Sequence, residues 1–331
     1  MQRDRSVVVI GAGSIGERHL RCLVSTGRAQ VGFVEVKADL RRQVAQKYPE
    51  VCAYQSMEQA FEAAPDLAVI ATPAPLHIMQ ATELAQRGVH VLIEKPLGVS
   101  MEGVERLIEA VQSRGVTAAV AYVYRAHPAL GRMREALVTG RFGKVLEIVA
   151  VSGQHFPHYR PAYRQTYFTR REQGGGAIQD ALTHLINAGE WLAGPVQRLA
   201  ADAGHQALAG VDVEDTVHVL TRQGDTMGTY TLNQHQAPNE TTITAVCERG
   251  TARFEMHRAR WMWMEKPEQD WQEESFGPLE RDELFVRQAH EFLDAAEGKR
   301  PPGCSLAEGV QTLKVNLAVM AAAERGTWEV S

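Results

Sequence analysis

The fold is decided by Gly11-Ala12-Gly13-Ser14-Ile15-Gly16, a glycine-rich stretch near the N-terminus. It follows the apolar run Ser6–Ile10, which predicts a buried strand, and leads into Gly16–Thr26, where apolar residues recur at helical spacing. Glycine-rich turns after strands also occur for purely steric reasons. Between a strand and a helix, however, such a turn typically binds the phosphates of a dinucleotide at the helix N-terminus. The residues predicted to bind it here are Gly11, Gly13, Ser14, Ile15 and Gly16.

Short apolar strands and amphipathic helices alternate over the residues that follow. Further strands are predicted at Val31–Val36, Asp66–Ala71, Val89–Ile93 and Thr117–Tyr122, with helical stretches between them. This alternation predicts a doubly wound parallel sheet of the Rossmann type, with helices on both faces. Glu35 ends the second strand about twenty residues after the turn, where an acidic side chain binds the ribose hydroxyls of a dinucleotide.

The pattern changes after Tyr124. Turns such as Gln223-Gly224-Asp225 separate strand-like runs and indicate hairpins. The predicted strands are Lys144–Val151, Thr216–Thr221, Thr226–Leu232, Thr241–Glu248, Thr251–His257 and Arg260–Glu265. We therefore expect a dinucleotide-binding domain over residues 1–123. Residues 124–331 are expected to form an α+β substrate and oligomerisation domain with an open, mostly antiparallel sheet. Packing of the terminal helix of this domain on the first domain is left open.

Composition excludes several classes of protein. The chain has 331 residues, of which 44% are hydrophobic, and a formal net charge of −5, which argues against a nucleic-acid partner. The four cysteines form no C-x-x-C pair, the charged N-terminus leads directly into the first strand, and no apolar run approaches the roughly 20 residues of a membrane span. His155 and His158 lack a third ligand nearby, so no metal is expected. These features indicate a cytoplasmic protein without a membrane partner.

Lys95 is a candidate catalytic residue because of its place in the predicted sheet. Glu94-Lys95-Pro96 follows the strand Val89–Ile93, and ligands of parallel sheets lie outside the carboxyl ends of the strands. A second copy, Glu265-Lys266-Pro267, follows a hairpin strand and is expected to lie on the surface. Position therefore favours Lys95, although a solvated lysine at the end of a strand is the alternative.

A second candidate pair follows three consecutive glycines at positions 174–176. Asp180 and His184 are four residues apart, so a helix places them on one face. A carboxylate can orient and stabilise a histidine that transfers a proton. A simple surface pair is the alternative for these two residues taken alone.

Together, these motifs resemble the Gfo/Idh/MocA oxidoreductases, the group of glucose–fructose oxidoreductase and inositol dehydrogenase. The resemblance covers nearly the whole chain and includes Ala71-Thr72-Pro73, His77, Tyr124-Arg125 and the terminal helix that begins near Ser305. It implies a Rossmann domain, an open antiparallel sheet and a homo-oligomer, either a dimer or a tetramer. Many members read D-x-G-x-H-x-x-D, whereas this chain has Leu182 and Asn187 at the glycine and final aspartate positions.

The resemblance also implies a reaction and the residues that perform it. A hydride passes between a hydroxyl-bearing carbon of a sugar and the nicotinamide of NAD(P). His184 acts as the general acid or base, Asp180 orients it, and Lys95 hydrogen-bonds the same oxygen. The cofactor crevice is expected to be lined by Thr72, Pro73, His77, Glu94, Lys95 and Arg125 in addition to the glycine turn and Glu35.

The cofactor is expected to be NAD rather than NADP, because Glu35 would face the extra phosphate of NADP. Lys37, Arg41 and Arg42 could soften that repulsion, so NADP stays the alternative. Two other functions remain open, namely a glycosidase-like enzyme that uses NAD transiently and a dinucleotide-binding sensor or co-regulator without turnover.

The segment Gln154–Gln173 indicates the substrate. It contains four arginines, three tyrosines at four-residue spacing and a single acid, Glu172. Arginine forks suit phosphate and carboxylate oxygens, so we expect a small-molecule sugar substrate that bears a phosphate or nucleotide. Arginines that cover the surface, or that pair with a neighbouring subunit, are the alternative. The predicted substrate residues are Tyr124, Arg160, Tyr163, Arg164, Tyr167 and Asn187.

Overall fold

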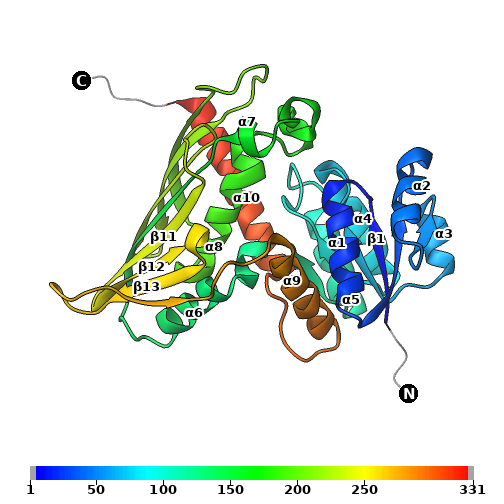
Figure 1. The fold of residues 1–331 in the computed structure, drawn as a ribbon, viewed down its shortest axis with the longest axis horizontal. Coiled ribbons are helices and arrows are strands. Elements are labelled where there is room, and N and C mark those ends of the chain that lie inside the picture. Colours follow the sequence, from blue (N-terminus) through cyan, green and yellow to red (C-terminus); the bar gives the residue numbers. More distant parts are fainter. Residues whose placement is uncertain (1–4, 327–331) are drawn as a thin grey trace. The chain divides into compact units, whose positions relative to one another are not determined.

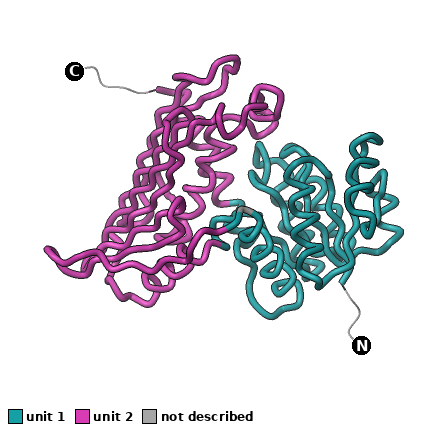
Figure 2. The backbone as a smooth tube through the Cα atoms, viewed as in Figure 1, with its two compact units in different colours: residues 1–126, 280–310 teal, residues 127–279, 311–331 magenta. Residues whose placement is uncertain are grey.

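The computed structural model describes residues 5–326 and divides the chain into two compact units. The first unit contains the residues up to Ala126 together with Glu280–Val310, and the second contains His127–Leu279 together with the residues from Gln311 onwards (Figure 2). The first unit is therefore discontinuous in sequence, whereas the two expected domains met between residues 123 and 124.

The first unit is built on a six-stranded parallel sheet with the order β3-β2-β1-β4-β5-β6. The order reverses between β1 and β4, which is the switch point at which doubly wound sheets bind ligands. The strands are β1 Arg5–Ile10, β2 Ala29–Val34, β3 Cys52–Tyr54, β4 Leu67–Ile70, β5 His90–Ile93 and β6 Ala118–Val120. The predicted Rossmann sheet is confirmed.

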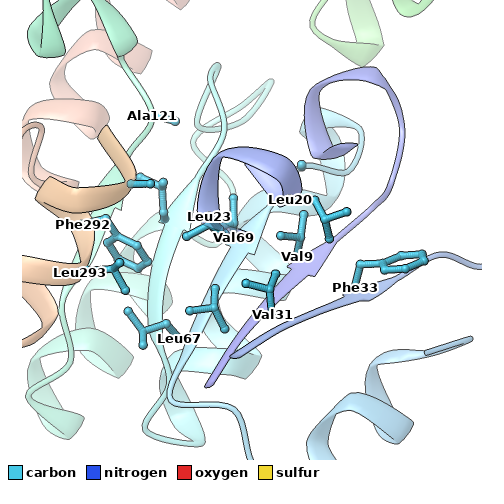
Figure 3. Packing of buried hydrophobic residues seen from close by; sticks show 14 of the residues in the cluster. Val9, Leu20, Leu23, Val31, Phe33, Leu67, Val69, Ala121, Phe292 and Leu293 are labelled. Carbon is cyan, nitrogen blue, oxygen red and sulfur yellow. The ribbon is translucent and has the colours of Figure 1, made fainter. Parts of the chain in front are cut away.

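Helices surround this sheet (Figure 1) and bury its apolar strands. They are α1 Ser14–Ser25, α2 Ala38–Lys47, α3 Met57–Glu62, α4 His77–Gln86, α5 Val104–Arg114 and α9 Arg281–Ala296. Figure 3 shows Phe292 and Leu293 of α9 in the same buried cluster as Leu23 of α1 and Leu67 and Val69 of β4. Asp282 strengthens the α1–α9 contact, because its carboxylate pairs with two arginines of α1. A helix from the last sixth of the sequence thus completes the first core.

The second unit is built on an eight-stranded sheet with the order β14-β13-β12-β11-β7-β10-β9-β8, in which β7 and β10 pair parallel and all other neighbours pair antiparallel. Helices α6 and α8 contact this sheet, and Figure 1 shows β11, β12 and β13 as adjacent strands. The helices are α6 Pro128–Val138, α7 Phe156–Tyr159, α8 Thr183–Ala193 and, from Gln311 onwards, the greater part of α10 Leu306–Arg325. The strands are β7 Val145–Gly153, β8 Arg198–Gly204, β9 Thr216–Gln223, β10 Thr226–Asn233, β11 Glu240–Cys247, β12 Gly250–Glu255, β13 Arg260–Met264 and β14 Gln272–Ser275.

The mostly antiparallel sheet of the second half is thereby confirmed, but the sequence did not reveal its two edge strands. The strand β8 reads RLAADAG and β14 reads QEES, so neither has the alternation of apolar and β-branched residues that marks a half-buried strand. Pairing with a neighbouring strand stabilises both in spite of their composition. Within residues 5–326, no helix is long and apolar enough to cross a membrane.

Candidate active site

The glycine turn joins β1 to α1 as the sequence predicts. Gly11 has a φ of +90°, and its N–H donates to the carbonyl of Val34 at 2.9 Å. A Cβ on Gly16 would lie 1.8 Å from the carbonyl oxygen of Gly11, so only glycine permits this approach of helix to turn. At Gly13, by contrast, no other atom of residues 5–326 lies within 4 Å of a Cβ position, apart from the neighbouring residues in the chain. The packing of these residues therefore leaves room for a side chain at Gly13, whereas close approach of a pyrophosphate would require a glycine.

Glu35 lies directly after β2, beside this turn. One carboxylate oxygen accepts the N–H of Ala12 at 3.1 Å and the other accepts the N–H of Lys37 at 2.9 Å. The guanidinium of Arg41 donates to the backbone carbonyl of Glu35 at 2.6 Å. The acidic Glu35 and the basic Arg41 therefore flank the place where the resemblance puts the adenosine ribose. The residues present fit a bound dinucleotide.

His77 joins the segments that follow β4 and β5. Its Nε2 lies 2.8 Å from the carbonyl oxygen of Thr72 and its Nδ1 lies 3.0 Å from that of Pro96. The ring is buried, and burial lowers the pKa of His77 below its ordinary value in spite of the two carbonyl oxygens. Thr72 is half-buried and Pro73 is exposed at the same end of the sheet. His77 thus links the segments that flank Lys95, and the cofactor role expected for it stays a prediction.

Glu94 is buried and binds the backbone of Lys95. Its carboxylate lies 2.6 Å from Nε2 of His19 on α1, and its other oxygen accepts the N–H of Lys95 at 3.0 Å. Burial by itself would raise the pKa of the Glu94 carboxyl, but the hydrogen bond and charge of His19, the charge of Lys95 and the Lys95 N–H together hold that pKa below its ordinary value. The half-buried Lys95 therefore follows β5 with its backbone fixed by a charged carboxylate.

Arg125 is also buried in the first unit. Its guanidinium donates to the carbonyl of Gly303 at 3.1 Å and to the carboxylate of Glu308 at 2.5 Å. Tyr124, its neighbour, is half-buried. The ion pair gives Arg125 a partner within the protein, and the cofactor role expected for it stays a prediction.

In the second unit, Asp180 and His184 lie on consecutive helical segments. Residues Ile178–Leu182 form a π-helix, and α8 begins at Thr183. Asp180 is 7% exposed and its carboxylate accepts a hydrogen bond from the hydroxyl of Tyr167 at 2.5 Å, whereas His184 is half-buried. The expectation of a regular helix across both residues is therefore wrong at Asp180. Single turns of π-helix are rare and occur frequently at functional sites.

Glu214 secures the beginning of this π-helix and was not anticipated from the sequence. It is buried, it accepts the N–H of Ile178 at 3.1 Å, and Arg171 donates to it at 3.0 Å. Gly176 has a φ of +84°, and a Cβ there would lie 2.3 Å from the Glu214 carboxylate. Glu214 is distant in sequence from the π-helix and belongs to no recognisable motif. The only sequence signal for it is the acidic pair Glu214-Asp215 directly before a predicted strand.

The arginine- and tyrosine-rich segment has its own small core, formed by Phe156, Tyr163, Phe168, Leu208, Val211 and Val213. Tyr163 is 3% exposed and donates to the carbonyl of Ala209 at 2.7 Å, while Nε of Arg164 donates to the same carbonyl at 2.7 Å. Asn187 is 1% exposed and donates to Thr312 of α10 at 3.0 Å. The structure thus places Tyr163 and Asn187 among packed residues, and their substrate roles stay predictions.

Three arginines of this segment are exposed and have no carboxylate within ion-pair distance among residues 5–326. They are Arg160, Arg164 and Arg170. Arg171 differs from them because it pairs with Glu214. No group of three or more metal-binding side chains occurs in the same part of the chain.

Comparison with known proteins establishes the family. Residues 5–122 match "Oxidoreductase family, NAD-binding Rossmann fold" and residues 130–253 match "GFO/IDH/MocA C-terminal domain". The chain therefore belongs to the Gfo/Idh/MocA oxidoreductases and carries their NAD-binding Rossmann domain. The expected family, the oxidoreductase class and the NAD cofactor are thereby confirmed.

Individual relatives cover nearly the whole chain at low identity. The levoglucosan dehydrogenase of Pseudarthrobacter phenanthrenivorans is 24% identical, with 98% of each chain covered, and the rhizopine catabolism protein MocA of Rhizobium meliloti is 26% identical, with 93% of this chain and 91% of the relative covered. A solved levoglucosan dehydrogenase in complex with NADH and levoglucosan superposes with a TM-score of 0.88 at 21% identity, covering 98% of each chain. The WlbA dehydrogenase from Bordetella pertussis, in complex with NADH and UDP-GlcNAcA, gives a TM-score of 0.82 at 24% identity, covering 99% of this chain and 100% of the other. These structures share the fold.

Proposed function

We propose that this oxidoreductase transfers a hydride between NAD and a hydroxyl-bearing carbon of a sugar that carries a phosphate, a carboxylate or a nucleotide. The observation that carries the anionic part is the set of three exposed arginines without a carboxylate partner within residues 5–326, in a chain of net charge −5. Guanidinium groups bind phosphate and carboxylate oxygens through two parallel hydrogen bonds. The ligand named for WlbA and the name of a further relative, the UDP-N-acetylglucosamine 3-dehydrogenase of Acidithiobacillus ferrooxidans, agree with this proposal.

Three residues of the chain perform the proton chemistry in this proposal. Bound NAD supplies the site that accepts or returns the hydride. His184 takes the proton of the substrate hydroxyl or gives it back, and Asp180 orients the imidazole. Lys95 donates a hydrogen bond to the same oxygen and stabilises the negative charge that develops on it.

A neutral sugar is the second candidate substrate. It is favoured by the levoglucosan dehydrogenase relative, which covers nearly the whole chain, and by relatives named inositol 2-dehydrogenase. In that case the three arginines cover the surface of the protein and bind no substrate, and the reaction at Lys95 and His184 is unchanged.

NADH formation by the purified protein tests the two candidates. The panel contains levoglucosan and myo-inositol as neutral sugars, and UDP-N-acetylglucosamine and glucose 6-phosphate as anionic ones. We expect a higher kcat/KM for an anionic member, and Arg164→Ala should reduce that advantage by about 10- to 100-fold, since a hydrogen bond to a charged group contributes about 1.5–3 kcal/mol.

Arg106→Ala is the matched control, because Arg106 is an exposed arginine of α5 and forms no ion pair with any residue of 5–326. The anionic proposal fails if neutral and anionic sugars react equally well in the wild type. The assignment of the proton chemistry to Lys95 and His184 fails if Lys95→Ala and His184→Ala form NADH as fast as the wild type does.

We also propose that the chain forms a homo-oligomer through the face of the eight-stranded sheet opposite α6 and α8. Side chains alternate along β9 and β10, and the outward positions include Leu220 at 62% exposure and Met227 at 52%. Large exposed apolar side chains on a sheet face are typical of a protein–protein interface.

A further inference from the structure

A hydrogen bond between the hydroxyl of Tyr167 and the carboxylate of Asp180 links the arginine-rich segment to the π-helix. The oxygen atoms are 2.5 Å apart, which is typical of an O–H group that donates to a charged carboxylate. Asp180 is 7% exposed, whereas Tyr167 is 41% exposed. A buried carboxylate is therefore held by a residue that reaches it from the surface.

The backbone around Tyr167 is fixed by its neighbours. Phe168 belongs to the small core of the segment, and the N–H of Arg170 donates to the carbonyl of Tyr167 at 2.9 Å. A Cβ on Gly175 would lie 2.4 Å from the carbonyl oxygen of Phe168 and 2.5 Å from that of Tyr167. Glycine at position 175 thus lets the Tyr167 turn pack directly against the chain that enters the π-helix.

A second anchor holds the π-helix itself. The N–H of Gly175 donates to the carbonyl of Arg170 at 2.9 Å, and Glu214 accepts the N–H of Ile178. Both ends of the Tyr167–Asp180 hydrogen bond therefore belong to backbone that has little freedom to move. A short hydrogen bond between two fixed groups restricts the rotation of the carboxylate.

We propose that Tyr167 is a positioning residue, which holds the Asp180 carboxylate in its charged form and in one orientation, and is not a contact for the sugar. The inference rests on the proposed function, because it concerns the carboxylate that orients His184. Donation of a hydrogen bond to the charged form of a carboxyl group favours that form. The single hydroxyl proton of Tyr167 is used by Asp180 and is not available to a substrate oxygen.

Steady-state kinetics of Tyr167→Phe test the role, with the sugar of the panel that the wild type oxidises fastest. The variant keeps the ring and loses the hydroxyl. We expect kcat to fall by about 10- to 100-fold, with the KM for the sugar changed less than about twofold and the Kd for NAD unchanged. Tyr48→Phe is the matched control, because Tyr48 donates to the Glu17 carboxylate at 3.0 Å and lies in the first unit. A raised KM with an unchanged kcat in Tyr167→Phe would show a substrate contact and overturn the inference.

A titration of tyrosine absorbance tests the hydrogen bond without any substrate. The difference between wild type and Tyr167→Phe reports the ionisation of Tyr167, which should occur above the ordinary pKa of about 10 because the phenolate would face a carboxylate. In Asp180→Asn that ionisation should move to lower pH. If it occurs at the same pH in both proteins, the inference is wrong. A wild type that oxidises no sugar overturns the proposed function instead, and the titration distinguishes the two failures.

Discussion

We expect single side chains around the dinucleotide turn to set the cofactor preference. Glu35 accepts two backbone N–H groups beside the glycine turn, and Arg41 binds the carbonyl of the same residue. A phosphate on the adenosine ribose would approach the Glu35 carboxylate, and two like charges about 4 Å apart repel by roughly 4 kcal/mol at an effective dielectric constant near 20. We expect Arg41 to reduce that repulsion without removing it.

We predict that NAD binds more tightly than NADP and that Glu35→Ala narrows the difference. Dissociation constants of both cofactors, measured by calorimetry for the wild type and the variant, check this prediction. Glu50→Ala should change neither constant, because Glu50 is exposed and has no ion pair among residues 5–326. Tighter binding of NADP to the wild type would contradict it.

We expect Lys95→Ala and His184→Ala each to lower turnover by about 10²- to 10⁴-fold, the usual contribution of a positioned acid or base. Circular dichroism should show that both variants fold, and His184→Ala should bind NAD as the wild type does. Unchanged turnover in His184→Ala would exclude this histidine as the acid or base.

At the scale of elements, the loop between β8 and β9 is held by one carboxylate. Asp215 is fully buried and accepts the N–H groups of Gln206, Ala207 and Leu208 and the hydroxyl of Thr216 at 2.8–2.9 Å. Burial by itself would raise the pKa of Asp215, but these hydrogen bonds lower it below its ordinary value. The loop also supplies three side chains to the small core beneath the arginine-rich segment.

The depressed pKa gives a pH-dependent stability. A carboxyl group whose folded pKa is lowered stabilises the fold above its unfolded pKa of about 3.9, and this stabilisation is lost as the pH falls through the folded pKa. We predict that Asp215→Asn lowers the free energy of unfolding by about 1–3 kcal/mol at pH 7. Melting temperatures of wild type and variant should converge as the pH falls below about 4. Asp212 lies in the same loop but is exposed, so Asp212→Asn should have the same melting temperature as the wild type at every pH.

The sequence predicted what depends on local pattern and missed what depends on distant partners. The glycine turn, the position of Glu35 and the strand before Lys95 follow from motifs whose residues are close in sequence. The π-helix at Asp180 depends on Glu214, which is more than thirty positions further along the sequence. A contact over that separation leaves no periodic pattern in the sequence. The edge strands β8 and β14 likewise depend on their neighbours rather than on their own residues.

At the scale of the whole molecule, the outer face of the second sheet leads to a prediction about assembly. We expect a dimer or a tetramer by size-exclusion chromatography with light scattering. Leu220→Glu together with Met227→Lys should shift it towards the monomer, because charges would then replace apolar side chains at the interface. Val138→Glu changes an equally exposed apolar residue on α6, at 65% exposure, and should leave the assembly intact. A monomeric wild type would refute the proposal.

The discontinuous first unit has a consequence for biosynthesis. A ribosome makes the chain from the N-terminus, so the six strands of the parallel sheet leave it long before α9 does. Until then Leu23, Leu67 and Val69 lack the side chains of Phe292 and Leu293 that share their cluster. Domains generally fold as units during synthesis, but this one can complete its core only after α9, and with it the whole second sheet that precedes α9, has been translated. The nascent protein must therefore keep an unfinished apolar surface in solution while the whole second sheet is still being made.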